Sequence, residues 1–304
     1  MGERLLGRGT QGLMTKKIAT AIGFVAVLLW ALLALFTAAS GGVPPFQLAA
    51  MTFAVGGSIG AVSWIWRPAG VRALRQPARV WLLGVGGLFG YHFAYFTALR
   101  NAPPVEAGLI AYMWPLLIIV FSALLPGERL RVHHVLGGVL GLAGAALIVT
   151  GGGAVAFRTQ YAFGYGAALI CALIWSSYSV LSRRFAKVST DAVTGFCLVT
   201  SVLALLAHAL LETTVWPAGL TQWMAVLGLG LGPVGAAFYV WDIGVKRGDI
   251  QVLGAASYLA PLLSTLVLIA SGYAVFTWVV ALACVLITGG AMLAAKDLLS
   301  RSVG

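Results

Sequence analysis

Charge is scarce in this chain of 304 residues. Asp, Glu, Lys and Arg make up 9% of it and 8 residues are acidic, whereas 61% are hydrophobic and the mean hydropathy is +0.98. Soluble globular domains carry about 25% charged residues, so this composition excludes that class. Runs of about 20 apolar residues are the length a helix needs to cross a hydrocarbon core of roughly 30 Å. The sequence therefore predicts an all-α integral membrane protein.

Groups that hold metals or perform catalysis are equally sparse. The 3 cysteines, Cys171, Cys197 and Cys284, lie in apolar segments without metal-ligand spacing, so we expect no metal and no cofactor. An intramembrane enzyme would need a catalytic constellation at depth. Asp242 stands alone near the end of an apolar segment and His92 has no evident nucleophile beside it. We therefore do not expect an enzyme, and this class stays a distant alternative.

Apolar segments of membrane-spanning length recur along the whole chain. We place ten of them at 17–39, 46–66, 80–99, 105–125, 132–150, 161–182, 192–211, 221–243, 250–271 and 274–295.

The second half of the chain repeats the landmarks of the first. At a shift of about 145 residues Trp30 meets Trp175 and Pro115-Leu-Leu meets Pro261-Leu-Leu. Each copy contains five spans, and an odd number forces the second copy to enter the membrane from the opposite side. Inverted repeats of this kind are typical of transporters, because they give a site at mid-membrane two alternative exits.

The repeats predict the domain organisation. We expect five-helix repeats at 17–152 and 161–296, with short tails at 1–16 and 297–304. Residues 1–13 form an extra tail in this interpretation, since Met14 is a natural start for the first span. A cleaved signal peptide is disfavoured because the apolar stretch is too long and its removal would delete the partner of the sixth span.

The basic residues predict orientation. If the N-terminus lies inside, all of the 19 Lys and Arg residues except Arg100 and Arg158 fall on the cytoplasmic side. Such asymmetry over short loops fixes the topology of a membrane protein. We therefore expect both termini in the cytoplasm and the net charge of +11 to face the lipid bilayer rather than nucleic acid.

The other charged residues near span ends have ordinary explanations. Asp242 precedes Lys246 by four residues, which suits an interfacial i,i+4 pair. Arg100 and Glu106 flank an outer Pro-Pro turn across which they are placed to pair. Glu128 lies at the cytoplasmic edge, where solvation is the default.

Polar and aromatic side chains at mid-membrane depth are the candidate binding residues. His92 lies in the middle of the third span between Tyr91 and Tyr95, and an ionisable side chain there usually faces the bundle interior. The alternative is a neutral histidine bonded to a neighbouring carbonyl. Trp30, Trp114 and Trp175 are also deep, whereas most of the other tryptophans fall at span ends.

The fourth span and its repeat mate, the ninth, carry Tyr-x-x-Pro-Leu-Leu. Pro115, after Tyr112, cannot donate to the carbonyl of Ala111, and Pro261, after Tyr258, cannot donate to that of Ser257. Freed carbonyls survive in lipid only if protein buries them or a wet cavity receives them. We expect hinges at the two prolines and a cavity wall beside the tyrosines, with a structural kink as the alternative.

The combination of these features resembles a known family. Ten helices in two inverted halves, Leu28-Leu29-Trp30 with its echo at Trp175, and Pro126-Gly127-Glu128-Arg129-Leu130 are typical of the drug/metabolite transporter superfamily, EamA type. The segments ending at Pro115 and Pro261 are similar to those of bacterial aromatic amino acid exporters. One departure is that the second half offers Gly272-Tyr273 in place of the Gly-Glu pair.

The resemblance implies a bacterial inner-membrane exporter of aromatic and other neutral amino acids, working by alternating access. A cavity edged by the tyrosines and tryptophans named above would stack an aromatic ring, and His92 and Ser257 with the freed carbonyls would bind its amino and carboxylate groups. Facilitated diffusion and proton exchange through His92 remain open. A different metabolite or a drug cation is the alternative substrate, although a cation would be expected to need a buried carboxylate.

Overall fold

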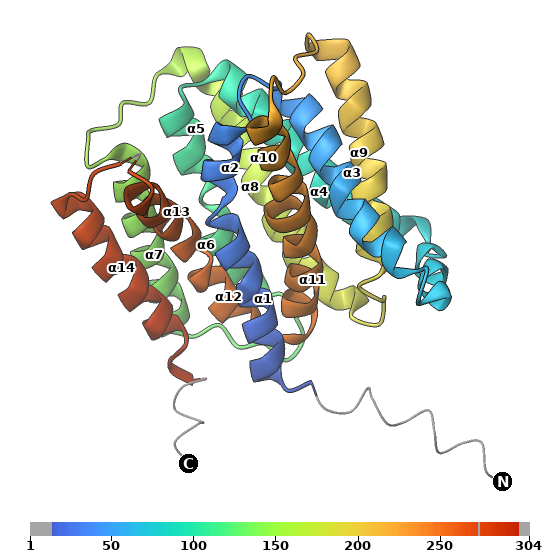
Figure 1. Ribbon diagram of the computed structural model, residues 1–304. Helices are drawn as coiled ribbons and strands as arrows, with labels where there is room; N and C mark the ends of the chain where they lie inside the picture. The colour runs from blue at the N-terminus through green and yellow to red at the C-terminus, as the bar shows by residue number, and fades with distance from the viewer. Residues whose placement is uncertain (1–13, 273, 298–304) are drawn as a thin grey trace.

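The computed structural model describes residues 14–272 and 274–297, so residues 1–13 of the predicted tail at 1–16 and residues 298–304 of the one at 297–304 lie outside it. Over this part of the chain every regular element is a helix (Figure 1). The elements are α1 (Lys16–Trp30), α2 (Leu33–Ala39), α3 (Pro45–Ser63), η1 (Pro68–Leu74), α4 (Ala78–Asn101), α5 (Pro104–Ala111), α6 (Trp114–Ser122), α7 (Val132–Thr150), η2 (Thr159–Tyr161), α8 (Ala162–Ser182), η3 (Arg183–Phe185), α9 (Ala192–Leu211), α10 (Leu220–Leu231), η4 (Gly232–Ala236), α11 (Ala237–Arg247), α12 (Ile250–Ala256), α13 (Leu259–Ala270) and α14 (Trp278–Ala294).

These elements join into the predicted spans. Among the described residues, 9 helical stretches are long and apolar enough to cross a membrane, and α14 supplies a shorter apolar helix. The all-α membrane fold is confirmed. The tenth span begins at Trp278 and not at residue 274, because the Thr277 side chain accepts a hydrogen bond from the Val280 N–H and caps the helix there.

The two halves pack against each other along their whole length. The most extensive helix contacts are α1 with α11, α4 with α8, α3 with α9, and α7 with α14, and each joins a helix of the first half to one of the second. In span order these are 1 with 8, 3 with 6, 2 with 7, and 5 with 10. An exchange of the halves maps this set onto itself, which is what inverted repeats related by a two-fold axis require.

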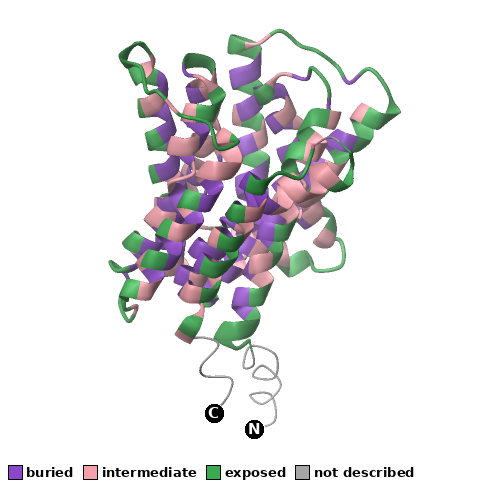
Figure 2. Ribbon diagram, turned by 90° about the vertical axis from the view of Figure 1, so that its left-hand side faces the viewer, coloured by how far each residue is buried: buried purple, intermediate pink, exposed green. Residues whose placement is uncertain are grey.

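Small residues set the closest of these contacts. A Cβ on Gly137 of α7 would lie 2.5 Å from the carbonyl oxygen of Gly290 on α14, and a Cβ on Gly290 would lie 2.5 Å from that of Gly137. Lipid provides little hydrophobic drive between helices, so close backbone approach is a main source of their association. Figure 2 shows the result, with buried residues between helices and exposed ones on the outer faces.

Four spans are interrupted part-way. The first breaks at Ala31–Leu32, the fourth at Tyr112–Met113 and the ninth at Ser257–Tyr258, while the π-helix η4 interrupts the eighth. Irregular backbone at membrane depth must be buried in protein or line a polar cavity. The interruptions therefore mark where the interior departs from simple helix packing.

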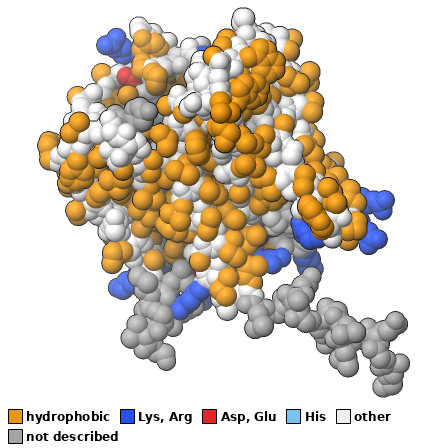
Figure 3. All heavy atoms as spheres, viewed as in Figure 1, with side chains coloured by type: hydrophobic (Ala, Val, Ile, Leu, Met, Phe, Trp, Pro, Cys, Tyr) orange, Lys and Arg blue, Asp and Glu red, His pale blue; other side chains and the backbone are white. Residues whose placement is uncertain are grey.

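The two ends of the bundle differ in charge. The start of α1 and the end of α14 lie at one end, where Lys and Arg side chains also gather (Figures 1 and 3). We call this the basic end, and define it by Lys16, Arg67, Arg129 and Arg183. The remaining surface of the bundle in Figure 3 is largely hydrophobic, as expected for a face in contact with lipid.

Candidate functional site

Four tryptophans from four different spans meet in the interior. Trp30 of α1, Trp114 of α6, Trp175 of α8 and Trp241 of α11 are all mutual neighbours, with ring centroids between 5.0 and 6.3 Å apart. Two come from each half. We call these residues the tryptophan cluster. Trp30, Trp114 and Trp175 are the three members that the sequence analysis named, and the structure places their rings side by side.

The cluster is fixed by hydrogen bonds to two neighbouring elements. Trp30 donates its indole N–H to the carbonyl of Pro233 in η4 at 3.1 Å, and Trp241 donates to Ser179 Oγ at 3.1 Å. The first bond satisfies a carbonyl in an irregular π segment, a type of element that is frequent at functional sites. Trp114 and Trp175 make no such bond within the part of the chain that the structure describes. Their N–H groups are the free donors of the cluster.

His92 lies in an aromatic enclosure next to the cluster. Its ring meets Phe53, Phe96 and Phe238 with centroids 5.0, 5.9 and 6.4 Å away, and Nδ1 lies 2.7 Å from the carbonyl of Leu88. The carbonyl bond is the structural role named as the alternative. Nε2 has no protein partner among the described residues, so the second ring nitrogen keeps a binding role open.

Tyrosines connect His92 to the cluster. Tyr91 packs on His92 at 5.2 Å and on Trp175 at 5.3 Å, and it stacks with Tyr95 at 6.1 Å and an interplanar angle of 9°. Tyr112 is the C-cap residue of α5, at the break between α5 and α6, and no ring contact joins it to this group among the described residues. Six of the predicted binding residues therefore form one contiguous group with Trp241, namely Trp30, Tyr91, His92, Tyr95, Trp114 and Trp175.

Tyr258 lies in a different environment. It is fully buried in a cluster with Ala145, Leu262 and Ile287, and its hydroxyl accepts a hydrogen bond from the Leu116 N–H at 3.1 Å. That N–H follows Pro115 at the helix break, so the hydroxyl replaces a missing helical acceptor. The structure thus gives Tyr258 a structural role, and its binding role stays a prediction.

Ser257 and the prolines lie at the helix breaks. The Ser257 hydroxyl donates to the Leu253 carbonyl at 2.7 Å, and the Ser257 carbonyl accepts from the Ala260 N–H at 3.1 Å. The expectation that this carbonyl is freed is therefore wrong, since a tighter turn takes up the acceptor. Pro115 and Pro261 both sit in the first turn of a new helix, α6 and α13, so the spans are broken rather than kinked.

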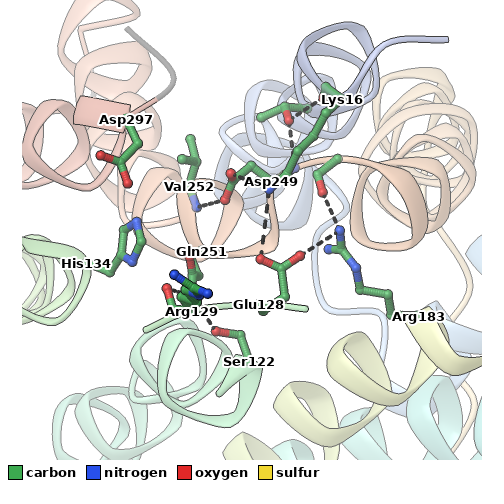
Figure 4. A network of polar contacts seen from close by, with 12 residues as sticks. Lys16, Ser122, Glu128, Arg129, His134, Arg183, Asp249, Gln251, Val252 and Asp297 are labelled. Carbon is green, nitrogen blue, oxygen red and sulfur yellow. Dashed lines mark hydrogen bonds and ion pairs between the residues drawn. The ribbon is translucent and has the colours of Figure 1, made fainter. Parts of the chain in front are cut away.

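An ionic network lies at the basic end, beyond the cluster (Figure 4). Glu128 binds Arg183 at 2.9 Å and lies 3.8 Å from Lys16, which in turn binds Asp249 at 2.8 Å. The expectation that Glu128 is solvated is wrong, because its side chain is only 13% exposed. Arg183 also donates to the Gly248 carbonyl at 2.9 Å. We call this group the Glu128 network, and it ties α1, α8 and α12 together.

A second network at the opposite end is centred on Glu212. Its carboxylate accepts the N–H groups of Phe46 and Gln47, each at 3.1 Å, and also binds Arg100 and His208. Arg100 therefore pairs with Glu212 and not with Glu106, whose partner is the hydroxyl of Tyr165. The predicted Arg100–Glu106 pair is wrong because the first turn of α3 and Arg100 converge on the same carboxylate.

Sequence reasoning missed Trp241. The predicted eighth span ended at residue 243, which placed this tryptophan near an interface, whereas α11 continues to Arg247. Trp241 is fully buried. The charged residues that follow it, Asp242, Lys246 and Arg247, favoured an earlier end of the span and hid its depth.

His133, His134 and Asp297 form a small cluster at the basic end. Their ligand-type atoms lie within 4.8 Å of one another, and Arg131 Nη1 donates to Asp297 Oδ1 at 2.9 Å. An arginine on the carboxylate already compensates its charge, so we interpret the group as an ion-pair contact that holds the start of α7 to the end of α14.

The repeated helical architecture and the interior aromatic site define a multi-pass membrane transporter. The chain belongs to the EamA-like transporter family, whose model matches residues 17–150 and again 162–295.

Individual relatives narrow the comparison. An aromatic amino acid exporter, YddG, of Ancylobacter novellus is 56% identical over 92% of this chain and 98% of its own. The aromatic amino acid exporter YddG of Escherichia coli is 26% identical over 83% of this chain and 88% of its own. A solved crystal structure with 55% identity superposes with a TM-score of 0.89, covering 94% of this chain and 99% of that one.

Proposed function

We propose that this protein exports aromatic and other neutral amino acids across the bacterial inner membrane, with both termini in the cytoplasm. The basic end is then the cytoplasmic end, as the distribution of Lys and Arg favours. A transport role, rather than an enzymatic one, is supported by the named relatives, which are exporters.

The observation that carries the substrate class is the tryptophan cluster. Indole and phenol rings bind an aromatic side chain by edge and face contacts, each worth about 0.5–1.5 kcal/mol beyond buried area. Trp30, Trp114 and Trp175, with Tyr91, Tyr95 and Tyr112, would stack on the ring. The free indole N–H groups, His92 Nε2 and Ser257 would bind the carboxylate and amino groups. Tyr258 would hold the wall of the cavity in place.

Alternating access would follow from rocking of residues 17–152 against residues 161–296. Pro115 and Pro261 lie in the first turn of the second helix of broken spans related by the repeat, so α6 and α13 are placed to swing relative to α5 and α12. Such hinges absorb a change in backbone angles at a few residues. Turnover that is unchanged in Pro115→Ala would remove this hinge from the mechanism.

The decisive test is uptake of labelled phenylalanine into liposomes containing the purified protein. Saturable uptake that tryptophan and threonine compete for, and a drug cation does not, is the expected result. Loss of uptake in His92→Ala and Trp114→Ala, with normal folding, would place the site. Transport of the cation alone would keep the fold and discard the substrate. The response to an imposed pH gradient separates proton exchange from facilitated diffusion.

A further inference from the structure

A hollow opens at the basic end between the two halves. Its volume is about 540 Å³, within the range of small-molecule sites of roughly 300–1,000 Å³. The start of α4 forms one wall and the segment from η3 toward α9 forms the other. The residues that line it are Gln76, Pro77, Arg79, Val80, Arg184, Phe185, Ala186, Lys187 and Val188.

The lining of the hollow selects for negative charge. Arg79, Arg184 and Lys187 are its three charged residues, and all three are basic. The guanidinium of Arg79 lies 5.8 Å from the ring centre of Phe185, so cationic and aromatic surfaces adjoin. A small carboxylate that carries an apolar side chain is complementary to such a surface.

A second and much narrower space, which we call the neck, adjoins the hollow. Val80, Phe185 and Val188 line both spaces, and the inner one has room for little more than one water molecule, with a volume of about 10 Å³. Its walls also contain Tyr178, Phe196, Asp242 and Lys246. The neck is therefore closed in this state, with two opposite charges in its wall.

Asp242 and Lys246 form a buried ion pair at that neck. Their side chains are 2% and 5% exposed and the oxygen–nitrogen distance is 2.9 Å. The expected i,i+4 pair is confirmed, but it lies inside the protein and not at the interface. Thr190 donates to Asp242 Oδ2 at 2.7 Å, and Lys246 donates to the Val188 carbonyl at 3.0 Å. Buried charges tolerate separation only if each finds a new partner.

Tyr178 joins the wall of the neck to the tryptophan cluster. Tyr178 lies 5.3 Å from Trp175 and its buried hydroxyl has no hydrogen-bond partner among the described groups. Trp241 directly precedes Asp242 in α11. A polar group that entered the neck would therefore meet an unused hydroxyl and then the indoles.

We propose that the hollow and its neck form an entry site for the zwitterionic head of an α-amino acid, separate from the tryptophan cluster. The three basic residues attract the carboxylate. At the neck the substrate ammonium binds Asp242 and its carboxylate binds Lys246, so the ion pair exchanges partners and no charge is left alone. The side chain then faces Tyr178 and Phe196. This inference rests on the proposed function and supplies its cytoplasmic access route.

The test is transport in liposomes with the protein in known orientation. The variant R79Q/R184Q/K187Q should raise KM for phenylalanine offered from the cytoplasmic side about threefold to tenfold, leave kcat and the outer-side KM unchanged, and weaken the salt dependence of KM. The control R72Q/R75Q/R247Q removes the same charge from exposed positions at the same end, outside the hollow, and should behave as wild type.

Inhibitors that carry only one charge sharpen the assignment. The hollow variant should lose inhibition by 3-phenylpropionate, which has no ammonium, and keep inhibition by phenethylamine, which has no carboxylate. The double variant D242N/K246M, which replaces the ion pair by neutral groups of similar size, should retain folded protein and lose the preference for the zwitterion over both.

Three outcomes decide the matter. A selective cytoplasmic KM effect supports the entry site. Unchanged cytoplasmic KM and inhibitor profile in both variants, in protein that transports phenylalanine, overturn the entry site and leave the proposed function standing. Wild-type protein that does not transport phenylalanine overturns both.

Discussion

An ionic network centred on a glutamate joins helices at each end of the molecule, but the two glutamates connect different helices. Glu212 joins the end of α9 to the start of α3 and to Arg100 of α4. Glu128 joins α1 to the end of α8 and, through Lys16, to the start of α12. The helices bound by Glu128 carry two of the clustered tryptophans. Those bound by Glu212 carry none.

The difference separates a permanent clamp from a releasable contact. Glu212 caps α3, whose N-cap Pro44 provides no side-chain acceptor, so its loss would damage one helix directly. Glu128 caps no helix and holds side chains on long, flexible stems. We infer that the Glu212 network stabilises the fold in every state and that the Glu128 network stabilises the state with its basic end closed.

The largest effect is expected for Glu212→Gln. Neutralising this buried carboxylate weakens the bonds to Arg100 and to two backbone N–H groups, and we expect the free energy of unfolding to fall by about 3 kcal/mol. Thermal unfolding in detergent measures it. Glu106→Gln at the same end is the control, since its described partner is a tyrosine hydroxyl. Equal unfolding temperatures for the two variants would contradict the stabilising role proposed for the Glu212 network.

Trp241→Phe is next in size and concerns binding rather than folding. The variant loses the hydrogen bond to Ser179 and part of the fourth ring, so we expect about a tenfold loss of affinity for phenylalanine, or roughly 1.4 kcal/mol. Calorimetric titration of purified protein reads it directly. Trp223 stacks on Trp216 outside the tryptophan cluster, so the control variant Trp223→Phe should bind phenylalanine as the wild type does. A matching loss in both variants would argue against the cluster.

Glu128→Gln should lower the free energy of unfolding by only about 1 kcal/mol, because Arg183 keeps its bonds to the Val245 and Gly248 carbonyls and Lys16 keeps its pair with Asp249. Its main expected effect is on conformation. A cysteine placed at buried Ser182, in a variant without the native cysteines, should react severalfold faster with a thiol reagent applied to the basic end once Glu128 is neutral. The same reporter combined with Glu212→Gln should not change. Faster labelling in both combinations would mean general loosening.

Arg131→Gln should have the smallest effect. The pair with Asp297 is partly exposed, at 52% and 35%, and such surface pairs contribute about 0–1 kcal/mol. We expect unchanged transport and unfolding within measurement error. A marked loss of stability would show that the α7–α14 contact depends on charge rather than on the close approach of Gly137 and Gly290.

The residue pattern predicted the fold well because lipid imposes a single strong rule on apolar length and because duplicated landmarks such as Trp30 and Trp175 align directly. The positions of the aromatic residues near the middle of their apolar segments predicted most of the group around His92. The sequence could not predict contacts that depend on the rotamer of a side chain or on which helix ends meet. Glu212, Tyr258 and Trp241 illustrate this, since each depends on packing between spans far apart in sequence.

The interruptions of the fourth and ninth spans were predicted in place but not in kind, whereas those of the first and eighth spans were not predicted. Pro115 and Pro261 indicate lost backbone bonds, and the chain responds with complete breaks because Tyr258 and a tight turn at Ser257 supply alternative partners. The π segment around Pro233 gave no comparable signal, since a proline near glycines is also common in straight spans. Trp30, which donates to the Pro233 carbonyl, lies in the other half of the molecule.

The short last helix has a consequence for the membrane itself. With 17 residues, α14 rises about 25 Å, less than the hydrocarbon thickness of roughly 30 Å. The surrounding lipid must thin locally or the helix ends must bring polar groups into the acyl region, at a cost of a fraction of a kcal/mol per Å. Because α14 packs along α7, this cost falls on one edge of the bundle. The acyl-chain length of the host membrane is thus part of the protein's working environment.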